Sequence, residues 1–442
     1  MKNKEITNEF LEKQKESYLS NKLNTIARHS LNKSNLIDIV RVGEEIGKLT
    51  DDFSIKVETH EPVTNQEKSG RCWLFSVENL LRESIAKEYN LESFELSQNY
   101  ISFYDKLEKS NYFIEKMTKE MVSRNYNDRE LVDFLKEPVS DGGYTSFFVN
   151  IIEKYGIVPK NAFNETYQSL NTDRTNEIIN TLLRKMYIEL RKNKDNSDEI
   201  YNSIKENTIT DIFRILCDIY GVPPTSFDFE YTDKDKKYHI IKNITPIEFY
   251  QKYIKIDLSK YHSVINVPIA DKPFNETYTY INAQNVYGAK PGIFLNIELS
   301  HFKDLAIKQL KSGEPIIFAC DVLKYLSNKD GIMSTKAFDF SSLFDIDLSL
   351  NKDEELISRN STANHAMLLT GVNIDENGIP NKWRIENSWG DKNGKKGYYV
   401  ASDEWFDKFV FELYINDKFL SDNDKQNLEK KPHEVEQWDP IV

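Results

Sequence analysis

The chain has few cysteines, no long apolar run and no excess of positive charge, and each absence excludes a class of protein. Its 442 residues include 3 cysteines, widely separated and odd in number, which gives no basis for a disulfide framework. The N-terminal residues are polar without the apolar core of a signal peptide, and no later stretch is long enough to span a bilayer. We therefore expect a cytoplasmic protein with no membrane partner.

Net charge and histidine spacing exclude two further kinds of site. The formal net charge is -13 and no basic stripe is evident, which disfavours a nucleic-acid partner. The basic clusters at 234–237 and 392–397 are short, and the second fits a hairpin turn better than a phosphate loop. Apart from His365, the histidines show no ligand spacing with one another or with the cysteines. We expect no metal and no cofactor.

Length and apolar content predict more than one hydrophobic core. The chain exceeds a typical single domain, and it contains 39% hydrophobic and 12% aromatic residues. Cys217 falls on an apolar helical face, and Cys320 ends the apolar run 315–319, so both are interpreted as packing residues. The remaining cysteine, Cys72, has a different setting.

Cys72 opens a predicted helix six residues after a glutamine. Gly70 breaks the preceding chain, and apolar residues then recur from Trp73 to Ile85 at helical spacing. A thiol in the first helical turn feels free backbone N–H groups and the helix dipole, which favour the thiolate. The side-chain NH2 of Gln66 and the N–H of Cys72 would together stabilise an oxyanion. The alternative interpretation is a buried structural cysteine.

A segment near the C-terminus supplies a base for such a thiol. His365 precedes the apolar strand 366–370, a turn follows, and the return strand ends at Asn387. The hairpin brings Asn387 beside His365, where its amide accepts from one imidazole nitrogen and leaves the other free for the thiol proton. Trp389 would shield that hydrogen bond from water. Together with Cys72 and the glutamine, these residues predict one Cys-His-Asn site for acyl transfer.

The motifs resemble the papain superfamily of cysteine peptidases. The similar elements are Gln66, Cys72-Trp73, His365 and the Asn-Ser-Trp-Gly run that begins at Asn387. The chain is further identified as a member of the bleomycin hydrolase and aminopeptidase C family by segments at 104–109, 138–143, 154–159 and 438–440. The resemblance runs from about residue 65 to the C-terminus.

The chain departs from the compact secreted members in two respects. Ser69 and Arg71 stand where the papain pattern has a disulfide cysteine and a small residue. His365 lies 293 positions after Cys72 (365 minus 72), against roughly 130 to 150 in the compact enzymes. The excess predicts an insertion of about one small domain.

The expected fold class is α+β, with the two lobes of a papain-like peptidase. Its parts are an N-terminal helical arm that wraps the body (1–62, with helices at 9–28 and 36–46), a helical papain-like lobe with the nucleophile helix (63–166), a helical insertion with oligomer contacts (167–255), an antiparallel β-barrel-like lobe (256–420) and a C-terminal arm that reaches the active-site cleft (421–442). Strands are expected at 263–267, 277–281, 293–297, 316–320, 366–370, 383–387 and 397–401. The cleft would lie between the lobes.

The resemblance also implies the substrate-binding residues. Gly142 and Gly143 would let an extended peptide approach, with an ordinary Asp-Gly turn as the alternative. Asn364 is expected to join them, and the terminal carboxylate of Val442 to pair with the ammonium of the first substrate residue. The tail stops soon after Trp-Asp-Pro, where family tails commonly run further, so the cleft would have room for more than one residue.

The predicted function is that of a cytoplasmic cysteine aminopeptidase that removes N-terminal residues through a thioester acyl-enzyme. Its expected partners are peptides with a free N-terminus, and the resemblance implies a homohexamer. Three alternatives stay open: an oligopeptidase or endopeptidase of the same fold, an acyl transferase that uses the same residues, and a nucleic-acid-binding scaffold, which the negative charge disfavours. The preferred first residue does not follow from the sequence.

Overall fold

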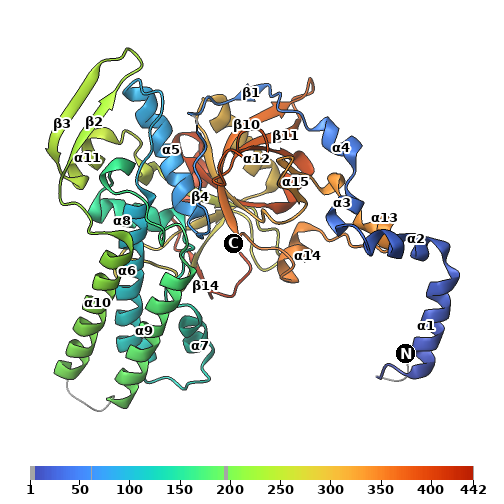
Figure 1. Ribbon diagram of the computed structural model, residues 1–442, viewed down its shortest axis with the longest axis horizontal. Helices are drawn as coiled ribbons and strands as arrows, with labels where there is room; N and C mark the ends of the chain where they lie inside the picture. Colours follow the sequence, from blue (N-terminus) through green and yellow to red (C-terminus); the bar gives the residue numbers. More distant parts are fainter. Residues whose placement is uncertain (1–4, 61, 194–197, 442) are drawn as a thin grey trace.

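The polypeptide forms a helical lobe and a sheet lobe that meet along helix α5 (Cys72–Glu88), as Figure 1 shows. The computed structural model describes residues 5–60, 62–193 and 198–441. Helix α5 begins directly after Gly70 and Arg71 and is buried on most of its circumference. A helix that is covered on nearly all sides by two different lobes holds its first residue in a fixed place relative to both.

The helical lobe packs around α5 with a largely apolar core. Besides α5 it contains α6 (Gln98–Lys116), which continues into the π-helical turn η1 (Met117–Met121), α7 (Arg129–Lys136), α8 (Thr145–Tyr155) and the short η2 (Lys160–Ala162). The Ser97 side chain caps α6 by accepting from the N–H of Tyr100. Phe103, Phe113 and Phe148 are fully buried between these helices.

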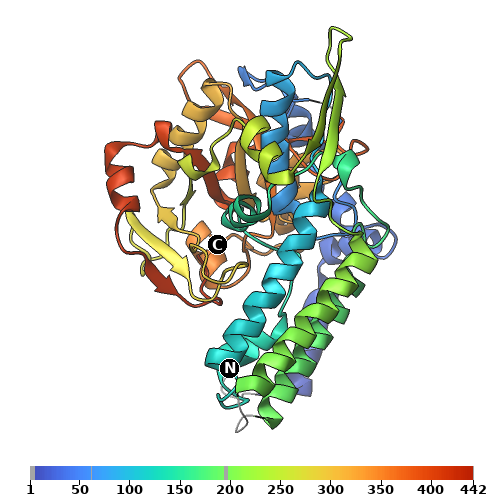
Figure 2. The ribbon, with the colours of Figure 1, turned by 90° about the vertical axis from the view of Figure 1, so that its left-hand side faces the viewer.

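The predicted insertion contributes two long helices and a small sheet. Helices α9 (Asp173–Lys192) and α10 (Asp198–Tyr220) run side by side and pack on α6, and Figure 2 shows them extending from the body. The hairpin of β2 (Phe227–Thr232) and β3 (Tyr238–Ile244) was not expected, because that region was predicted to be helical. Its aromatic residues alternate with polar ones from Phe227 to Tyr231, which is the period of a strand. A capping box at Thr245 then starts α11 (Pro246–Tyr253).

The sheet lobe is built on one large, mostly antiparallel sheet. Its strands follow the order β14-β5-β6-β4-β13-β7-β10-β11-β12-β9-β8, and β1 pairs with β10. The strand bounds are β1 (Ile55–Lys56), β4 (Tyr261–Ile265), β5 (Glu276–Tyr280), β6 (Phe294–Asn296), β7 (Ile316–Cys320), β8 (Leu326–Ser327), β9 (Ile332–Met333), β10 (His365–Ile374), β11 (Pro380–Glu386), β12 (Tyr398–Ser402), β13 (Val410–Asn416) and β14 (His433–Val435). The sequence analysis missed β13, which lies between β4 and β7 in the middle of the sheet.

Helices α12 (Leu299–Lys311) and α15 (Asp403–Phe409) pack against this sheet. The other helices in this part of the chain are η3 (Leu258–Lys260), η4 (Thr335–Ala337), α13 (Phe340–Phe344), α14 (Lys352–Ile357), η5 (Asp417–Phe419) and α16 (Asp422–Leu428). Phe302 of α12 and Phe406 of α15 are fully buried against the sheet, and Trp383 of β11 stacks on Phe406 with ring centroids 4.2 Å apart. The sheet therefore has a closed apolar side and a second side that faces the helical lobe.

The N-terminal arm does not wrap the body as expected. Its helices are α1 (Asn8–Ser20), α2 (Lys22–Leu31), α3 (Leu36–Val40) and α4 (Gly43–Lys48), and Figure 1 shows α1 extending away from the sheet lobe. No residue of α1 or α2 is buried. Helix α2 contacts α13 of the sheet lobe. Further along the arm, the Val40 carbonyl accepts from the N–H of Asp339 at 2.7 Å. Leu19 and Leu23 of the arm are exposed apolar residues.

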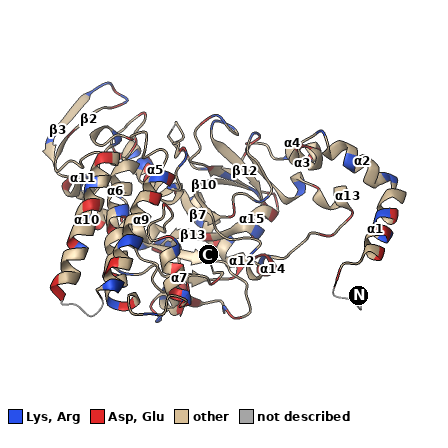
Figure 3. Ribbon diagram, turned by 60° about the horizontal axis from the view of Figure 1, so that its bottom comes forward, with Lys and Arg blue, Asp and Glu red and all other residues tan. Residues whose placement is uncertain are grey.

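Acidic and basic residues are interspersed along the helices in Figure 3. None of the helices in the ranges that the structure covers is both long and apolar enough to cross a bilayer. Within the same ranges, no cluster of three or more His, Cys, Asp or Glu side chains is arranged to hold a metal ion.

A buried ion pair joins the two lobes. Arg82 of α5 donates from Nη2 to Glu386 Oε1 of β11 at 2.8 Å and to Glu83 Oε1 at 3.1 Å, and its Nη1 donates to the Pro62 carbonyl at 3.1 Å. The side chain of Glu386 is fully buried and that of Arg82 is 3% exposed. Burial raises the pKa of Glu386 to about 7, while Arg82 lowers it. Each charge therefore depends on the other to remain inside the protein.

We expect Arg82→Met to lower the free energy of unfolding by about 3 kcal/mol, because a buried carboxylate loses its partner. Arg82→Met combined with Glu386→Gln should recover part of that loss. Arg174→Met, which removes a charge from the exposed pair with Glu177, is the matched control and should change stability little. Urea denaturation followed by tryptophan fluorescence measures all three. Equal stability of the Arg82 and Arg174 variants would contradict the role of the pair.

Candidate active site

Cys72 is the first residue of α5, and the chain before it is tied down by hydrogen bonds. The N-cap residue, Arg71, makes no side-chain cap, so the first N–H groups of α5 are not covered by one. Arg71 is buried, and its guanidinium donates from Nε to Ser69 Oγ at 2.9 Å and from Nη1 to Glu165 at 3.0 Å. The two residues that depart from the secreted papain pattern, Ser69 and Arg71, therefore hold this turn by polar contacts.

Gln66 precedes the nucleophile in the chain, and two hydrogen bonds fix its side-chain amide. Its Nε2 donates to the Ser69 carbonyl at 2.6 Å, and its Oε1 accepts from Ser388 Oγ at 2.6 Å. The Ser69 carbonyl can only accept a hydrogen bond, so the amide atom beside it must be the nitrogen, and the atom beside the Ser388 hydroxyl is the oxygen. Since an NH2 group has two hydrogens, the contact with Ser69 leaves one for another acceptor. The sequence analysis gave no role to Ser388, although it lies inside the Asn-Ser-Trp-Gly motif.

His365 and Asn387 are brought together by the hairpin of β10 and β11. The register pairs Leu368 with Glu386, which places Asn387 next to the start of β10. His365 Nε2 and Asn387 Oδ1 are 2.8 Å apart, and the same oxygen accepts from the N–H of Ser388 at 2.7 Å. An amide oxygen can only accept, so Nε2 carries the imidazole proton and Nδ1 is left as the base.

The Trp389 ring lies beside the imidazole ring of His365. The ring centroids of His365 and Trp389 are 4.8 Å apart. His365 is 6% exposed and Asn387 is fully buried. The hydrogen bond between them is therefore shielded from water, which strengthens it.

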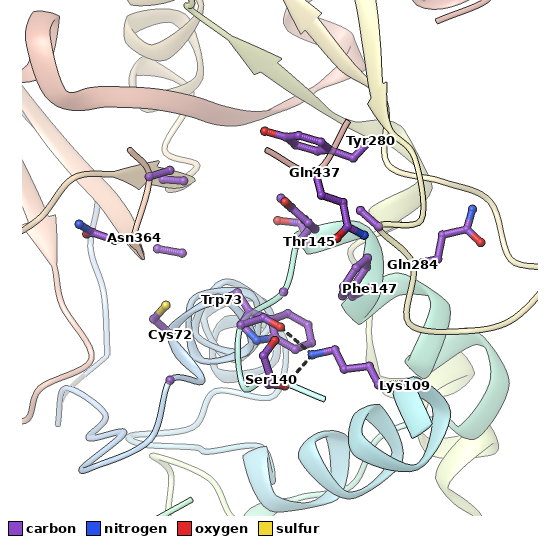
Figure 4. Close-up of a pocket in the computed structure, with 18 of the residues that line it drawn as sticks. Cys72, Trp73, Lys109, Ser140, Thr145, Phe147, Tyr280, Gln284, Asn364 and Gln437 are labelled. Carbon is purple, nitrogen blue, oxygen red and sulfur yellow. Dashed lines mark hydrogen bonds between the residues drawn. The ribbon is translucent and has the colours of Figure 1, made fainter. Parts of the chain in front are cut away.

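The thiol and the imidazole line one cavity, although they come from different lobes. The cavity has a volume of about 530 Å³. Figure 4 shows Cys72 and Trp73 at the end of α5, facing Asn364 across the space. A backbone hydrogen bond from Ala366, the residue after His365, reaches Cys72. Cys72 thus sits against the first residues of β10.

Burial disfavours both a thiolate at Cys72 and an imidazolium at His365 when either forms without the other. Desolvation raises the pKa of the Cys72 thiol, although backbone hydrogen bonds from Ala366 and Trp73 oppose this. Desolvation also lowers the pKa of His365 to about 4, against the hydrogen bond with Asn387. The helix N-terminus favours the thiolate, as the sequence indicated, but burial of the thiol acts in the opposite direction and was not expected. A proton transfer from Cys72 to His365 creates both charges together, and each then stabilises the other.

The predicted substrate-binding residues fall into three groups. Gly142 and Gly143 line the cavity, and a Cβ on Gly143 would lie 2.7 Å from the Trp73 ring, so only glycine fits there. Asn364 also lines the cavity, but its amide is engaged, with Nδ2 donating to Asp321 Oδ1 at 2.6 Å and Oδ1 accepting from the N–H of Val322 at 3.1 Å. Val442 lies outside the described residues.

Two buried lysines, which the sequence analysis did not single out, hold the glycine segment in place. Lys109 donates to the carbonyl oxygens of Ser140 and Gly142 at 3.0 and 2.6 Å (Figure 4). Lys106 pairs with Asp141 at 2.5 Å, and the same carboxylate accepts from the Gly70 N–H at 2.9 Å. Burial alone would raise the pKa of Asp141, but Lys106 and other donors lower it below its ordinary value, so the carboxylate stays ionised. These contacts join the family-specific segments 104–109 and 138–143 to the turn before Cys72.

The C-terminal arm reaches the same cavity. Strand β14 pairs with β5, and Gln437 then lines the cavity (Figure 4). The Arg129 guanidinium lies 4.1 Å from the Trp438 ring centroid, and Asp439 pairs with Lys272 at 3.1 Å. Ile441 is fully buried. The arm is therefore anchored beyond the point where it enters the cavity.

Comparison with known proteins assigns the family. The model of the Peptidase C1-like family matches residues 5–442. The chain belongs to this family. The Peptidase C1-like chain is 45% identical over 394 residues to "Aminopeptidase C" of Lactobacillus delbrueckii subsp. lactis, covering 88% of this chain and 87% of that protein. It is 39% identical to "Aminopeptidase C" of Lactobacillus helveticus, covering 99% and 98%.

A solved structure shares the whole fold of this Peptidase C1-like protein. The crystal structure of PepW from Lactobacillus rhamnosis HN001 superposes with a TM-score of 0.96 at 39% identity, covering 99% of both chains. The predicted family and the predicted papain-like α+β fold are thereby confirmed.

The low pKa of His365 predicts the acid limit of turnover. His365 must be neutral to accept the Cys72 proton, and a pKa of about 4 keeps it neutral into acidic solution. We expect kcat/KM, which reports ionisation of the unliganded enzyme, to fall only as the pH approaches about 4. This is well below the ordinary imidazole value of about 6.5. Hydrolysis of a fluorogenic alanyl amide at pH values from about 3 to 8 measures this loss of activity, with circular dichroism at each pH as the control for folding. A loss of activity centred near pH 6.5 in folded protein would contradict the assignment of His365 as a buried base.

Proposed function

We propose that this chain is a cysteine aminopeptidase that removes residues from the free N-terminus of peptides, with Cys72 as nucleophile, His365 as base, Asn387 as its orienting partner and Gln66 as an oxyanion donor. The observation that carries the proposal is that Cys72 opens α5 in the wall of a cavity that His365 also lines, with Asn387 bonded to His365 at 2.8 Å. The enzyme class predicted from the sequence is confirmed by the relatives named aminopeptidase C.

The reaction proceeds in two steps through a thioester. His365 Nδ1 takes the proton of Cys72 as the sulfur attacks the substrate carbonyl carbon, and the negative charge moves to the carbonyl oxygen. The N–H of Cys72 and the remaining Gln66 hydrogen stabilise that oxyanion. The C–N bond then breaks, His365 gives its proton to the leaving amine, and the thioester remains. A water attacks the thioester with His365 as base, which releases the acid and restores the thiol.

The C-terminal arm is proposed to restrict the cleft to substrate N-termini. Gln437 lines the cavity, and the residues after it are held by Arg129 and Lys272. An arm in the cleft occupies space that a longer peptide would need on the N-terminal side of the scissile bond. The oligopeptidase alternative requires that this space be open.

Two further proposals concern the protein in its cell. Cytoplasmic location is supported by the three cysteines, which are all free thiols. A homohexamer is supported by α1 and α2, whose apolar residues Leu19 and Leu23 are 55% and 70% exposed and need a partner surface. The mass of the protein in solution, measured by light scattering, tests the hexamer.

We expect Cys72→Ala to abolish hydrolysis of an alanyl amide, because no other group in this mechanism attacks the carbonyl, while the protein stays folded. Cys217→Ala is the matched control, since it removes a partly exposed thiol outside the cavity and should keep its turnover. Initial rates and circular dichroism are the measurements. Full turnover by the Cys72 variant would refute the proposed nucleophile.

Removal of residues 437–442 should open the cleft to N-acetylated peptides. We expect their hydrolysis to rise at least tenfold relative to the same peptides with a free amine, since the arm no longer fills the cleft. Asp439→Asn, which weakens the pair with Lys272, should give a smaller rise in the same direction. Parallel digests followed by mass spectrometry compare them. If blocked and free peptides change equally, the arm does not restrict the cleft.

A further inference from the structure

Strand β13 directs one carboxylate into the active-site cavity. Leu413 and Ile415 of this strand are buried in the apolar core of the sheet lobe, while Glu412 and Tyr414 alternate with them and line the cavity. Glu412 is 8% exposed, so its side chain is almost enclosed. Burial of a charge is costly, so a buried glutamate on a central strand is normally paired with a positive group.

Among the described residues, no Lys, Arg or His forms an ion pair with Glu412. The cavity contains the ammonium of Lys109, but that group pairs with Asp105 at 2.7 Å and donates to Ser140 and Gly142. Desolvation raises the pKa of Glu412 to about 7, and a hydrogen bond with Ser263 lowers it. The carboxylate therefore has no positive partner within residues 5–60, 62–193 and 198–441.

Aromatic rings surround this carboxylate. Burial raises the pKa of Tyr144 and of Tyr414, and the nearby charge of Glu412 raises both further. Tyr144 and Tyr280 are stacked with centroids 6.2 Å apart, and all three tyrosines line the cavity. Aromatic faces beside a carboxylate form a setting that attracts an organic cation and its aliphatic stem.

The strand register gives the distance from Glu412 to the nucleophile. Glu412 pairs with Ala319 of β7, and Ala319 pairs with Ala366 of β10. Neighbouring strands are about 4.8 Å apart, so the backbone of Glu412 lies roughly 10 Å from that of Ala366. Ala366 hydrogen-bonds to Cys72. An extended peptide advances about 3.3 Å per residue, so this span matches one or two substrate residues plus the reach of the glutamate.

We propose that Glu412 is the cation-binding group of the substrate cleft and pairs with an ammonium or guanidinium of the bound peptide. This inference rests on the proposed peptidase function and adds a specificity-determining residue to it. The cation has two sources, the α-ammonium of the first residue or a lysine or arginine side chain. In either case the positive charge supplies the partner that Glu412 lacks among the residues that the structure describes.

Equilibrium binding to an inactive protein tests the proposal without turnover. The full-length Cys72→Ala protein is compared with Cys72→Ala/Glu412→Gln by calorimetry at about pH 7.5. At this pH a carboxylate of pKa about 7 is mostly ionised, and a peptide α-amino group, with an ordinary pKa of about 7.7 to 8.0, is still mostly protonated. The probes are the amidated tripeptides Ala-Ala-Ala, acetyl-Ala-Ala-Ala and acetyl-Lys-Ala-Ala. Loss of a charge-assisted contact should weaken binding of the recognised cation tenfold to a hundredfold.

The probes distinguish the two sources. If the α-ammonium is bound, Glu412→Gln weakens Ala-Ala-Ala only, and if a side chain is bound, it weakens acetyl-Lys-Ala-Ala only. Binding of the neutral acetyl-Ala-Ala-Ala should stay the same, which also establishes that the variant is folded. Asp133→Asn is the matched control, because Asp133 lines the same cavity but is less buried, and its effect on the recognised cation should be smaller.

Three results would overturn the proposal. They are unchanged binding of both cationic probes, an equal loss for the neutral probe, and an equal loss in the Asp133 variant, which would indicate only the general charge of the cleft. Failure of the aminopeptidase proposal is separate from these, since it would appear as a wild-type protein that does not hydrolyse unblocked peptides.

Discussion

The active site depends on the buried contact between α5 and the β10–β11 hairpin, with the pair of Arg82 and Glu386 at its centre. Cys72 is at the start of the same helix, and Asn387 directly follows Glu386. Any sliding of the helix on the hairpin would separate the thiol from its base. The lobes are therefore fixed to one another by a pair of charges that neither lobe would bury without the other.

Polar contacts extend this constraint from the nucleophile to the substrate-binding wall. Asp141 binds the Gly70 N–H, Lys106 and the Thr172 hydroxyl, and its carbonyl accepts from Trp73 Nε1 at 2.6 Å. The turn before Cys72 and the glycine segment are thus held by one residue. Glu412 and Gln437 of the C-terminal arm line the same cavity, and both are proposed to select substrates. The proposed reacting groups and the groups proposed to select substrates thus lie on different helices and strands, which meet at the cleft.

The sequence singled out Cys72, His365 and Asn387, which the structure brings together, because their signals are local. A cysteine after a glycine at a helix start, and a histidine and asparagine on a two-strand hairpin, can each be recognised within a few residues. Lys109 and Asp141 were not predicted as positioning residues, since their partners are tens of positions away in the chain. Strand β13 was missed although its run from Val410 to Ile415 is rich in β-branched and aromatic residues, and with it Glu412 was missed. The arm was expected on the body because sequence shows apolar faces but not what covers them.

The most direct test of the account is a time course of an unblocked hexapeptide with the wild-type protein, followed by mass spectrometry. The account predicts that residues leave in order from the N-terminus, with each shortened peptide appearing before the next, and that the N-acetylated hexapeptide stays intact. Internal fragments that appear first, or equal cleavage of the acetylated peptide, would contradict it.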